Sequence, residues 1–313
     1  MHAFVFPGQG SQFIGMGKDL AEAFPSAREV FEEVDETLNQ KLSQIMFTGA
    51  ESELNLTENT QPALMAVSMA VVRILQQAMP DLFTPAKIKC VAGHSLGEYS
   101  ALTAAGSFQV KDTAKLLKTR GQAMQKAVPV GVGAMAAILG LEIDAVTAIA
   151  KEASASEIVS AANDNSFGQI VVSGHKAAVE KAIALATAKG AKRAILLPVS
   201  APFHCSLMKP AAETMRAALA AVDIKPPAVP LVANVSAGFV TDPAKIRQLL
   251  VDQVTGMVRW RESVLYMKSQ GVTTLVELGA GKVLSGLTRR IDAELTGRSV
   301  GTPKDIEEFI ATL

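Results

Sequence analysis

The sequence is poor in the residues that mark several classes of protein. Only two cysteines, Cys90 and Cys205, occur among its 313 residues, together with a single tryptophan. Two cysteines are too few for a disulfide framework, and no paired C-x-x-C pattern typical of a zinc site is present. We therefore expect that the protein belongs to a reducing compartment and that it holds no metal.

An excess of charge of either sign is also missing. Lysine plus arginine and aspartate plus glutamate each number 30, so the formal net charge is zero. Without a global positive field, nucleic acid and an anionic membrane are poor candidate partners. The N-terminus lacks a basic signal-peptide region, and no apolar run approaches the roughly 20 residues that cross a bilayer. We expect a cytoplasmic protein with neither partner.

Short β-rich runs alternate with alanine-rich helical stretches along most of the chain. Three of these runs, at 3–6, 88–92 and 273–278, break at glycine turns. This rhythm is typical of an α/β protein with a mostly parallel sheet. Because such sheets bind ligands beyond the carboxyl ends of their strands, we expect chemistry at these turns.

The middle of the chain has a different order of elements. The pattern predicts, in sequence, a strand, a helix, two strands, a helix and a strand, at 134–139, 144–153, 158–162, 169–173, 177–188 and 194–199. The order βαββαβ is the ferredoxin-like pattern. We predict a small domain at 129–199 inserted into a large domain formed by 1–128 and 200–313, with a cleft between them.

The strongest local motif is GHSLG at 93–97. A G-x-S-x-G between a strand and a helix is a nucleophile elbow, in which glycines permit a tight turn and the serine stands clear of the backbone. The same pattern also occurs by chance in ordinary loops. Here a strand is predicted before it and a small-residue helix at 98–105 after it, which favours Ser95 as a nucleophile.

A serine hydroxyl needs a base within hydrogen-bonding reach. Of the four histidines, His204 is the best candidate, because it follows the last strand of the small domain, where the chain returns to the cleft. A purely structural histidine is the alternative. Its neighbour Cys205 has no elbow and is a weaker nucleophile candidate. No acid stands out as a third member, so a backbone carbonyl is an alternative partner for the histidine.

Arg120 occupies an unexpected face of a helix predicted at 111–127. One face of that helix carries mostly basic residues at spacings of three or four, namely Lys111, Lys115, Lys118, Gln122 and Lys126. Arg120 instead aligns with Leu116 and Met124 on the apolar face. A guanidinium is costly to bury unpaired, so it requires an anion. Either an internal carboxylate or a substrate carboxylate would satisfy it.

The glycine-rich loop PGQGSQ at 7–12 allows a close approach to its backbone and offers free amide donors. One such amide, together with that of Leu96, would form an oxyanion hole. Nucleotide binding is disfavoured, because Phe13 replaces the third glycine of G-x-G-x-x-G and the Gly281-Lys282 pair lacks the rest of a phosphate loop.

Six segments, spread in order over nearly the whole chain, carry a family resemblance. They are FPGQGSQ at 6–12, GHSLGE at 93–98, Arg120-Gly121, Asn165 with Gly168-Gln169, SAPFHC at 200–205 and ELGAGKVLSG at 277–286. Together they closely resemble the malonyl-CoA:acyl carrier protein transacylases of fatty acid synthesis. The resemblance implies an α/β-hydrolase-like core with a ferredoxin-like insert, which agrees with the pattern above.

The resemblance also implies roles for individual residues. Ser95 would be the nucleophile, His204 the base and Arg120 the clamp for the malonyl carboxylate. The oxyanion amides would come from Gln9 and Leu96. Two further implied residues are Gln253, whose backbone carbonyl would orient the histidine, and Phe203, which would favour malonyl over methylmalonyl groups.

Three positions depart from the family pattern. Phe167 and Ala280 stand where many members carry proline, and Met257 replaces a frequent proline after the glutamine. These positions lie in loops, so they affect local geometry and substrate detail more than the type of reaction.

The implied reaction is a ping-pong transfer. A malonyl group passes from coenzyme A to Ser95 and then to the phosphopantetheine thiol of acyl carrier protein, with no metal or bound cofactor. Four basic residues are weak candidates for holding an acidic carrier: Lys209, Lys282, Arg289 and Arg290. The alternatives are an acyltransferase that serves a polyketide pathway in trans, a serine hydrolase or thioesterase, and a noncatalytic scaffold. We expect a monomer.

Overall fold

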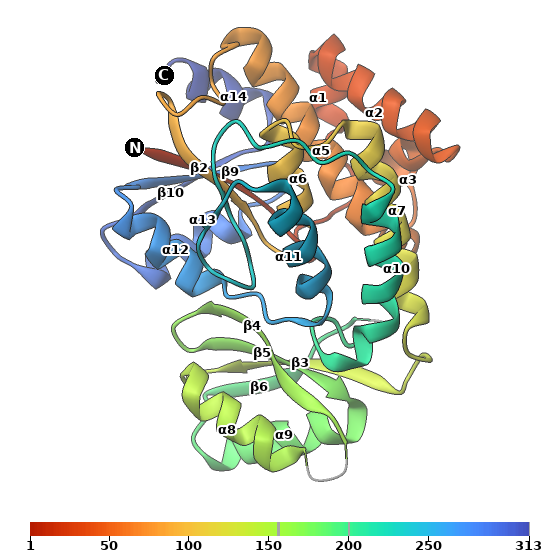
Figure 1. The fold of residues 1–313 in the computed structure, drawn as a ribbon, viewed down its shortest axis with the longest axis vertical. Helices are drawn as coiled ribbons and strands as arrows, with labels where there is room; N and C mark the ends of the chain where they lie inside the picture. Colours follow the sequence, from red (N-terminus) through yellow and green to blue (C-terminus); the bar gives the residue numbers. More distant parts are fainter. Residues whose placement is uncertain (155–156, 200, 313) are drawn as a thin grey trace.

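A computed structural model describes residues 1–154, 157–199 and 201–312, and its two β-sheets organise the fold (Figure 1). Ser200, where we expect the chain to return to the large domain, lies outside the described residues. The larger sheet has the order β10-β9-β1-β2-β7-β8, and every neighbouring pair except β7 and β8 is parallel. Its strands are β1 (His2–Phe6), β2 (Ile88–Gly93), β7 (Leu231–Val232), β8 (Phe239–Val240), β9 (Thr274–Leu278) and β10 (Thr296–Val300).

Helices cover both faces of this sheet. The helices outside the smaller sheet are α1 (Lys18–Ala23), α2 (Pro25–Leu38), α3 (Leu42–Thr48), α4 (Glu51–Leu54), α5 (Thr57–Ala78), α6 (Gly97–Ala104), α7 (Val110–Lys126), α10 (Lys209–Ala220), α11 (Pro243–Thr255), α12 (Trp260–Ser269), α13 (Val283–Ile291) and α14 (Pro303–Ile310), with a short 3-10 turn, η1 (Ser206–Met208). None of the helices in the described part of the chain is both long and apolar enough to span a bilayer.

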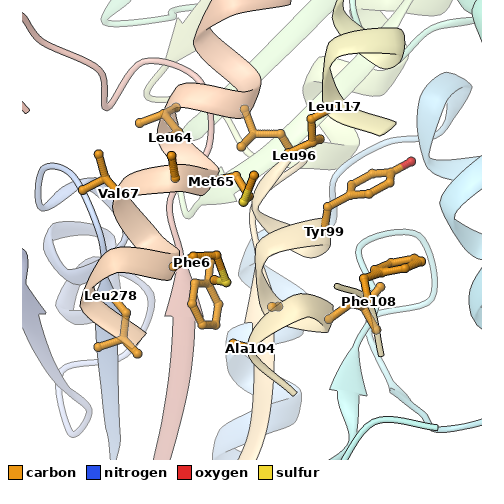
Figure 2. Packing of buried hydrophobic residues seen from close by; sticks show 14 of the residues in the cluster. Phe6, Leu64, Met65, Val67, Leu96, Tyr99, Ala104, Phe108, Leu117 and Leu278 are labelled. Carbon is orange, nitrogen blue, oxygen red and sulfur yellow. The ribbon is translucent and has the colours of Figure 1, made fainter. Parts of the chain in front are cut away.

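The alternation of side chains along β1 explains the two cores. Phe4 and Phe6 point into the larger cluster, whereas Ala3 and Val5 belong to a second cluster with Trp260. Figure 2 shows Phe6 lying between α5 and α6. All five side chains are fully buried, which is typical of a parallel sheet covered on both faces.

The smaller sheet is antiparallel and has the order β4-β5-β3-β6. It contains β3 (Gly133–Leu139), β4 (Val159–Ser166), β5 (Gln169–His175) and β6 (Arg193–Leu196), and the helices α8 (Ile143–Ala153) and α9 (Lys176–Ala188) cover its outer face (Figure 1). The predicted fold class, with a mostly parallel sheet and a βαββαβ insert, is confirmed. The proposed domain boundaries at 129 and 199 remain a prediction.

The last predicted strand of the insert is shorter than expected. It was expected at 194–199 but ends at Leu196. Pro198 has no amide hydrogen and cannot continue the ladder, which accounts for the early end. Strands β7 and β8 have two residues each, too few for a periodic pattern to predict them.

The smaller sheet is joined to the larger unit along β4. The amide of Val258 donates to Ala162 O, and the amide of Asp164 donates back to Val258 O, both at 2.9 Å. The buried Asp164 carboxylate also pairs with Arg261 at 2.8 Å. These contacts fix the neighbouring residues Asn163 and Asn165 at the edge of the site.

The turn between β2 and α6 leaves no room for side chains at its glycines. A Cβ at Gly93 would lie 1.9 Å from the backbone of Gly97, and a Cβ at Gly97 would lie 2.2 Å from Phe6 O. Backbone atoms in a packed sheet cannot move aside as a flexible side chain does. The two glycines of the motif therefore permit the close packing of α6 on β1 and β2.

We predict that Gly93→Ala lowers the free energy of unfolding by more than about 3 kcal/mol, because the new methyl group collides with backbone. The control is Gly286→Ala in α13, where a Cβ meets nothing within 4 Å. This exposed helical position should gain up to about 1 kcal/mol. Chemical denaturation of both variants checks the pair, and equal stabilities would contradict the packing account.

Candidate active site

Ser95 lies at the tip of the turn between β2 and α6, as the motif predicts. Its φ is +53°, a left-handed backbone conformation that is uncommon for a residue with a side chain. The side chain of Asn234 holds this turn through two hydrogen bonds. Its Oδ1 accepts from the Ser95 amide at 2.8 Å, and its Nδ2 donates to Gly93 O at 2.7 Å. The strained serine is therefore clamped on both sides.

His204 lies within hydrogen-bonding distance of this serine. Ser95 Oγ and His204 Nε2 are 2.7 Å apart. The other ring nitrogen, Nδ1, lies 2.9 Å from Gln253 O and 3.2 Å from Gly256 O. Carbonyl oxygens only accept, so we assign the ring proton to Nδ1, which leaves Nε2 free to accept from the serine hydroxyl. The histidine partner is thus a backbone carbonyl.

The surroundings of His204 keep its imidazole neutral. Burial, and to a smaller extent the positive charge of Arg120, lower its pKa from 6.5 to about 3, although the hydrogen bond to the Gln253 carbonyl acts in the opposite direction. A neutral imidazole with a free Nε2 is the form that removes a proton. The pair therefore has the geometry and the protonation state of a nucleophile and its base.

Arg120 reaches the same point from α7 and is only 1 % exposed. Its Nη2 donates to Ser95 Oγ at 3.1 Å and to Gln253 Oε1 at 2.8 Å, and its Nη1 donates to Gln61 Oε1 at 2.7 Å. None of the ion pairs between described residues includes Arg120. Among the described residues, no internal carboxylate therefore forms an ion pair with Arg120.

Ser95, His204 and Arg120 open onto one cavity of about 690 Å³, a volume that includes space open to solvent. The remaining lining residues are Gln9, Gln61, His94, Leu96, Met124, Met135, Asn163, Asn165, Val171, Leu197, Val199 and Phe203. The larger unit supplies the reactive groups, and β3, β4 and β5 of the smaller sheet supply part of the opposite wall. The cavity thus lies where the sequence predicts a cleft.

Gln9 and Leu96 lie on the serine side of this cavity. The Gln9 side chain is held by Thr57, whose Oγ1 donates to Gln9 Oε1 at 2.9 Å. Leu96 is the N-cap of α6, so its amide is one of those a helix leaves without an intrahelical acceptor. Both residues line the cavity that Ser95 opens onto, and the role of their amides as oxyanion donors stays a prediction.

Phe203 is 8 % exposed and forms part of the apolar wall. A bulky ring here narrows the space beside His204. Cys205, which follows, is buried and its Sγ donates to Pro202 O. Burial raises the pKa of its thiol, so Cys205 is not an activated nucleophile.

Several polar residues of the site were not found by sequence reasoning. His94 bonds through Nε2 to Asn165 Oδ1 at 2.8 Å and so links the two units. Glu98 is fully buried beneath the serine and accepts from the Asn234 amide at 2.8 Å. Neither residue carries a local signal of its role, because the partners Asn165 and Asn234 are remote in sequence.

The three departures from the family pattern lie outside the reactive centre. Phe167 is half exposed, and Arg261 lies 4.8 Å from the centre of its ring. Ala280 is buried, and Met257 is partly exposed.

Within the described residues, no group of three or more histidine, cysteine, aspartate or glutamate side chains has an arrangement that could hold a metal.

Comparison with known proteins agrees with this geometry. Residues 3–291 match the family model described as an acyl transferase domain. The malonyl CoA-acyl carrier protein transacylase of Bacillus subtilis is 49% identical over 99% of this chain and 96% of its own length. The crystal structure of the acyl-carrier-protein-S-malonyltransferase from Bartonella henselae has a TM-score of 0.97 and 55% identity, covering 99% of this chain and 98% of that one.

A third similar structure includes a partner. It is described as a type II PKS acyl-carrier protein in complex with its malonyl-transacylase, and it has a TM-score of 0.96 and 43% identity over 100% of this chain and 99% of that one. With a matched model over most of its length and relatives far above 30% identity, this chain belongs to the acyl transferase family, among the malonyl CoA-acyl carrier protein transacylases.

Proposed function

We propose that this chain transfers a malonyl group from malonyl-CoA to the phosphopantetheine thiol of acyl carrier protein and so supplies fatty acid synthesis. One observation carries the proposal. The guanidinium of Arg120 is buried 3.1 Å from Ser95 Oγ without a carboxylate partner among the described residues. An acyl group that is esterified to Ser95 and ends in a carboxylate would bring an anion to this guanidinium and complete the missing ion pair.

The first half-reaction forms the ester. His204 Nε2 takes the proton of Ser95 Oγ as the oxygen bonds to the thioester carbonyl carbon. The amides of Gln9 and Leu96 stabilise the oxyanion. The carbon–sulfur bond then breaks, the proton passes from His204 to the sulfur, and coenzyme A leaves as a thiol.

The second half-reaction reverses these steps with a different thiol. His204 removes the proton of the carrier's phosphopantetheine thiol, the sulfur attacks the ester carbon, and Ser95 recovers its proton from His204. Throughout, the Gln253 carbonyl holds the ring proton on Nδ1. Arg120 keeps the malonyl carboxylate in place, and Phe203 limits the space for a branched acyl group. No step needs a metal or bound cofactor.

The carrier is the proposed protein partner, and its acidic surface would face exposed basic residues. Lys209 begins α10, Lys282 precedes α13, and Arg289 and Arg290 lie in the last turn of α13. Their contacts with a carrier remain a proposal, as do a monomeric state and a cytoplasmic location. A polyketide carrier is the alternative acceptor, since one similar malonyl-transacylase is in complex with such a protein.

The proposal predicts one malonyl adduct, on Ser95, after brief mixing with malonyl-CoA. Intact-protein mass spectrometry measures it, and Ser95→Ala should abolish it. Added carrier protein with a free phosphopantetheine thiol should discharge the adduct at least about 100-fold faster than water does. Discharge by water at the same rate would indicate a hydrolase, and binding without any adduct would indicate a scaffold.

Arg120→Met should slow the transfer of acyl groups that end in a carboxylate much more than the transfer of those that do not. Loss of a charge-assisted bidentate contact should slow malonyl adduct formation at least about 100-fold, whereas the acetyl adduct, which has no carboxylate, should change by less than about tenfold. The matched control is Lys126→Met on the exposed face of α7, which should change neither rate. Equal losses for both acyl groups would contradict the clamp.

The lowered pKa of His204 predicts an unusual pH dependence. Protonation removes the base, and because the folded-state pKa lies well below 6.5, the loss of adduct formation should begin only at correspondingly lower pH. Rapid-quench rates in a series of buffers measure this limb. Arg120→Met should move it to higher pH, since the guanidinium charge lowers this pKa, and an acid limb near 6.5 in the unmodified protein would contradict the account.

A further inference from the structure

Glu98 is a buried carboxyl group that the reaction described above does not use. It lies in the first turn of α6, three residues after the nucleophile, and is fully buried. Its Oε2 accepts from the amide of Asn234 at 2.8 Å and from Gln253 Nε2 at 3.1 Å. Its Oε1 is buried and, in the described part of the structure, has no hydrogen-bond partner. Only one of its two oxygens is therefore stabilised as a carboxylate.

Glu98 is connected to Arg120 through a single side chain. Gln253 donates from Nε2 to Glu98 and accepts at Oε1 from Arg120 Nη2 at 2.8 Å. Gln253 Nε2 also donates to Ser95 O at 2.9 Å. The amide dipole of Gln253 thus points its positive end at the carboxyl group and its negative end at the guanidinium. The two ionisable groups share one bridge without touching.

The net charge of the buried site depends on the protonation of Glu98 and on whether an acyl carboxylate is bound. With Glu98 ionised, its charge offsets that of Arg120 in the empty site. A malonyl carboxylate arriving at Arg120 would then leave a buried net charge of −1, which a medium of low dielectric constant penalises. With Glu98 protonated, Arg120 and the acyl carboxylate balance each other, so the empty and the malonylated site favour different protonation states of Glu98.

We propose that Glu98 is a positioning residue that serves as the counter-charge of Arg120 in the empty site and takes up a proton from solvent when a malonyl carboxylate occupies the guanidinium. This inference rests on the proposed function, because it needs the malonyl group on Ser95 with its carboxylate at Arg120. The proton neutralises Glu98 and frees the full charge of Arg120 for the substrate.

The electrostatic surroundings of Glu98 support such a change. Burial raises its pKa to about 7, against the lowering effects of Asn234, Gln253 and Arg120. Tyr99 on the same helix stays neutral, because burial raises the pKa of its phenol, and His204 is neutral because its pKa is lowered. Arg120 is therefore the charged group that acts on Glu98, and the carboxyl group changes its ionisation in the neutral pH range.

Linkage gives the sign of the effect. If the malonylated site binds more protons than the empty one, malonyl binding weakens as pH rises, by up to about tenfold per pH unit above the pKa of Glu98. Adduct formation should therefore take up a fraction of a proton per site near neutral pH, and this fraction should rise toward one as the pH increases above the pKa of Glu98, because more of the empty sites then start with an ionised carboxyl group.

The test counts protons during adduct formation in weakly buffered solution with a pH indicator, and mass spectrometry counts adducts in the same sample. The unmodified protein should take up more protons per malonyl adduct than Glu98→Gln, and the excess should rise toward one proton as the pH increases. The matched control is Glu277→Gln, a second buried glutamate whose two oxygens accept from the Leu284 and Ser285 amides. Coenzyme A is released in every arm, so its thiol cancels in the comparison.

The outcomes separate this inference from the proposed function. No malonyl adduct in the unmodified protein would overturn the proposed function itself. An adduct with the same proton count in the unmodified protein and in Glu98→Gln would overturn only the role of Glu98. An excess that persists in Glu277→Gln and disappears in Glu98→Gln would support it.

A second measurement avoids any change at Glu98, in case Glu98→Gln does not fold or react. The Ser95→Ala variant binds malonyl-CoA without reacting, and calorimetry in two buffers of different ionisation enthalpy gives the protons taken up. Malonyl-CoA should bind with proton uptake and acetyl-CoA without it. Equal uptake for the two thioesters would contradict the inference.

Discussion

The guanidinium of Arg120 lies buried 3.1 Å from Ser95 Oγ, and much of the surrounding structure serves to keep a positive charge there. Removing such a group from water costs several kcal/mol unless polar partners replace the solvent. Gln61 and Gln253 supply neutral oxygens that satisfy Nη1 and Nη2 without neutralising the charge. The guanidinium therefore has no carboxylate in direct contact among the described residues, and an acyl carboxylate can occupy that position.

The same charge shapes the chemistry of its neighbours. It helps to keep His204 unprotonated, and it lowers the pKa of Glu98 against the larger effect of burial. Gln253 joins these groups, because its side chain contacts Arg120, Glu98 and Ser95 O while its backbone carbonyl orients His204. One residue of α11 thus positions both the base and the carboxylate clamp. This sharing makes the effects of single substitutions here non-additive.

Sequence reasoning located the parts of the site that carry local signals. The glycines around Ser95 indicate a strand-to-helix turn, and the helical spacing of Arg120 places it on an apolar face. The supporting residues carry no such signal, because their partners are remote in sequence: Asn234 lies 139 residues from the amide it accepts from. The short strands β7 and β8, and the early end of β6 before Pro198, also depend on tertiary pairing or on a single residue rather than on a periodic pattern.

The most direct test of the account is a crystal structure of the protein trapped as its malonyl-Ser95 ester, by soaking with malonyl-CoA in the absence of carrier protein and cooling before water discharges the ester. The account predicts that the malonyl carboxylate accepts from Arg120, that Nη2 has left Ser95 Oγ, and that the ester carbonyl oxygen points at the amides of Gln9 and Leu96. A carboxylate directed to solvent or to Asn165, with Arg120 still on Gln61 and Gln253 alone, would contradict it.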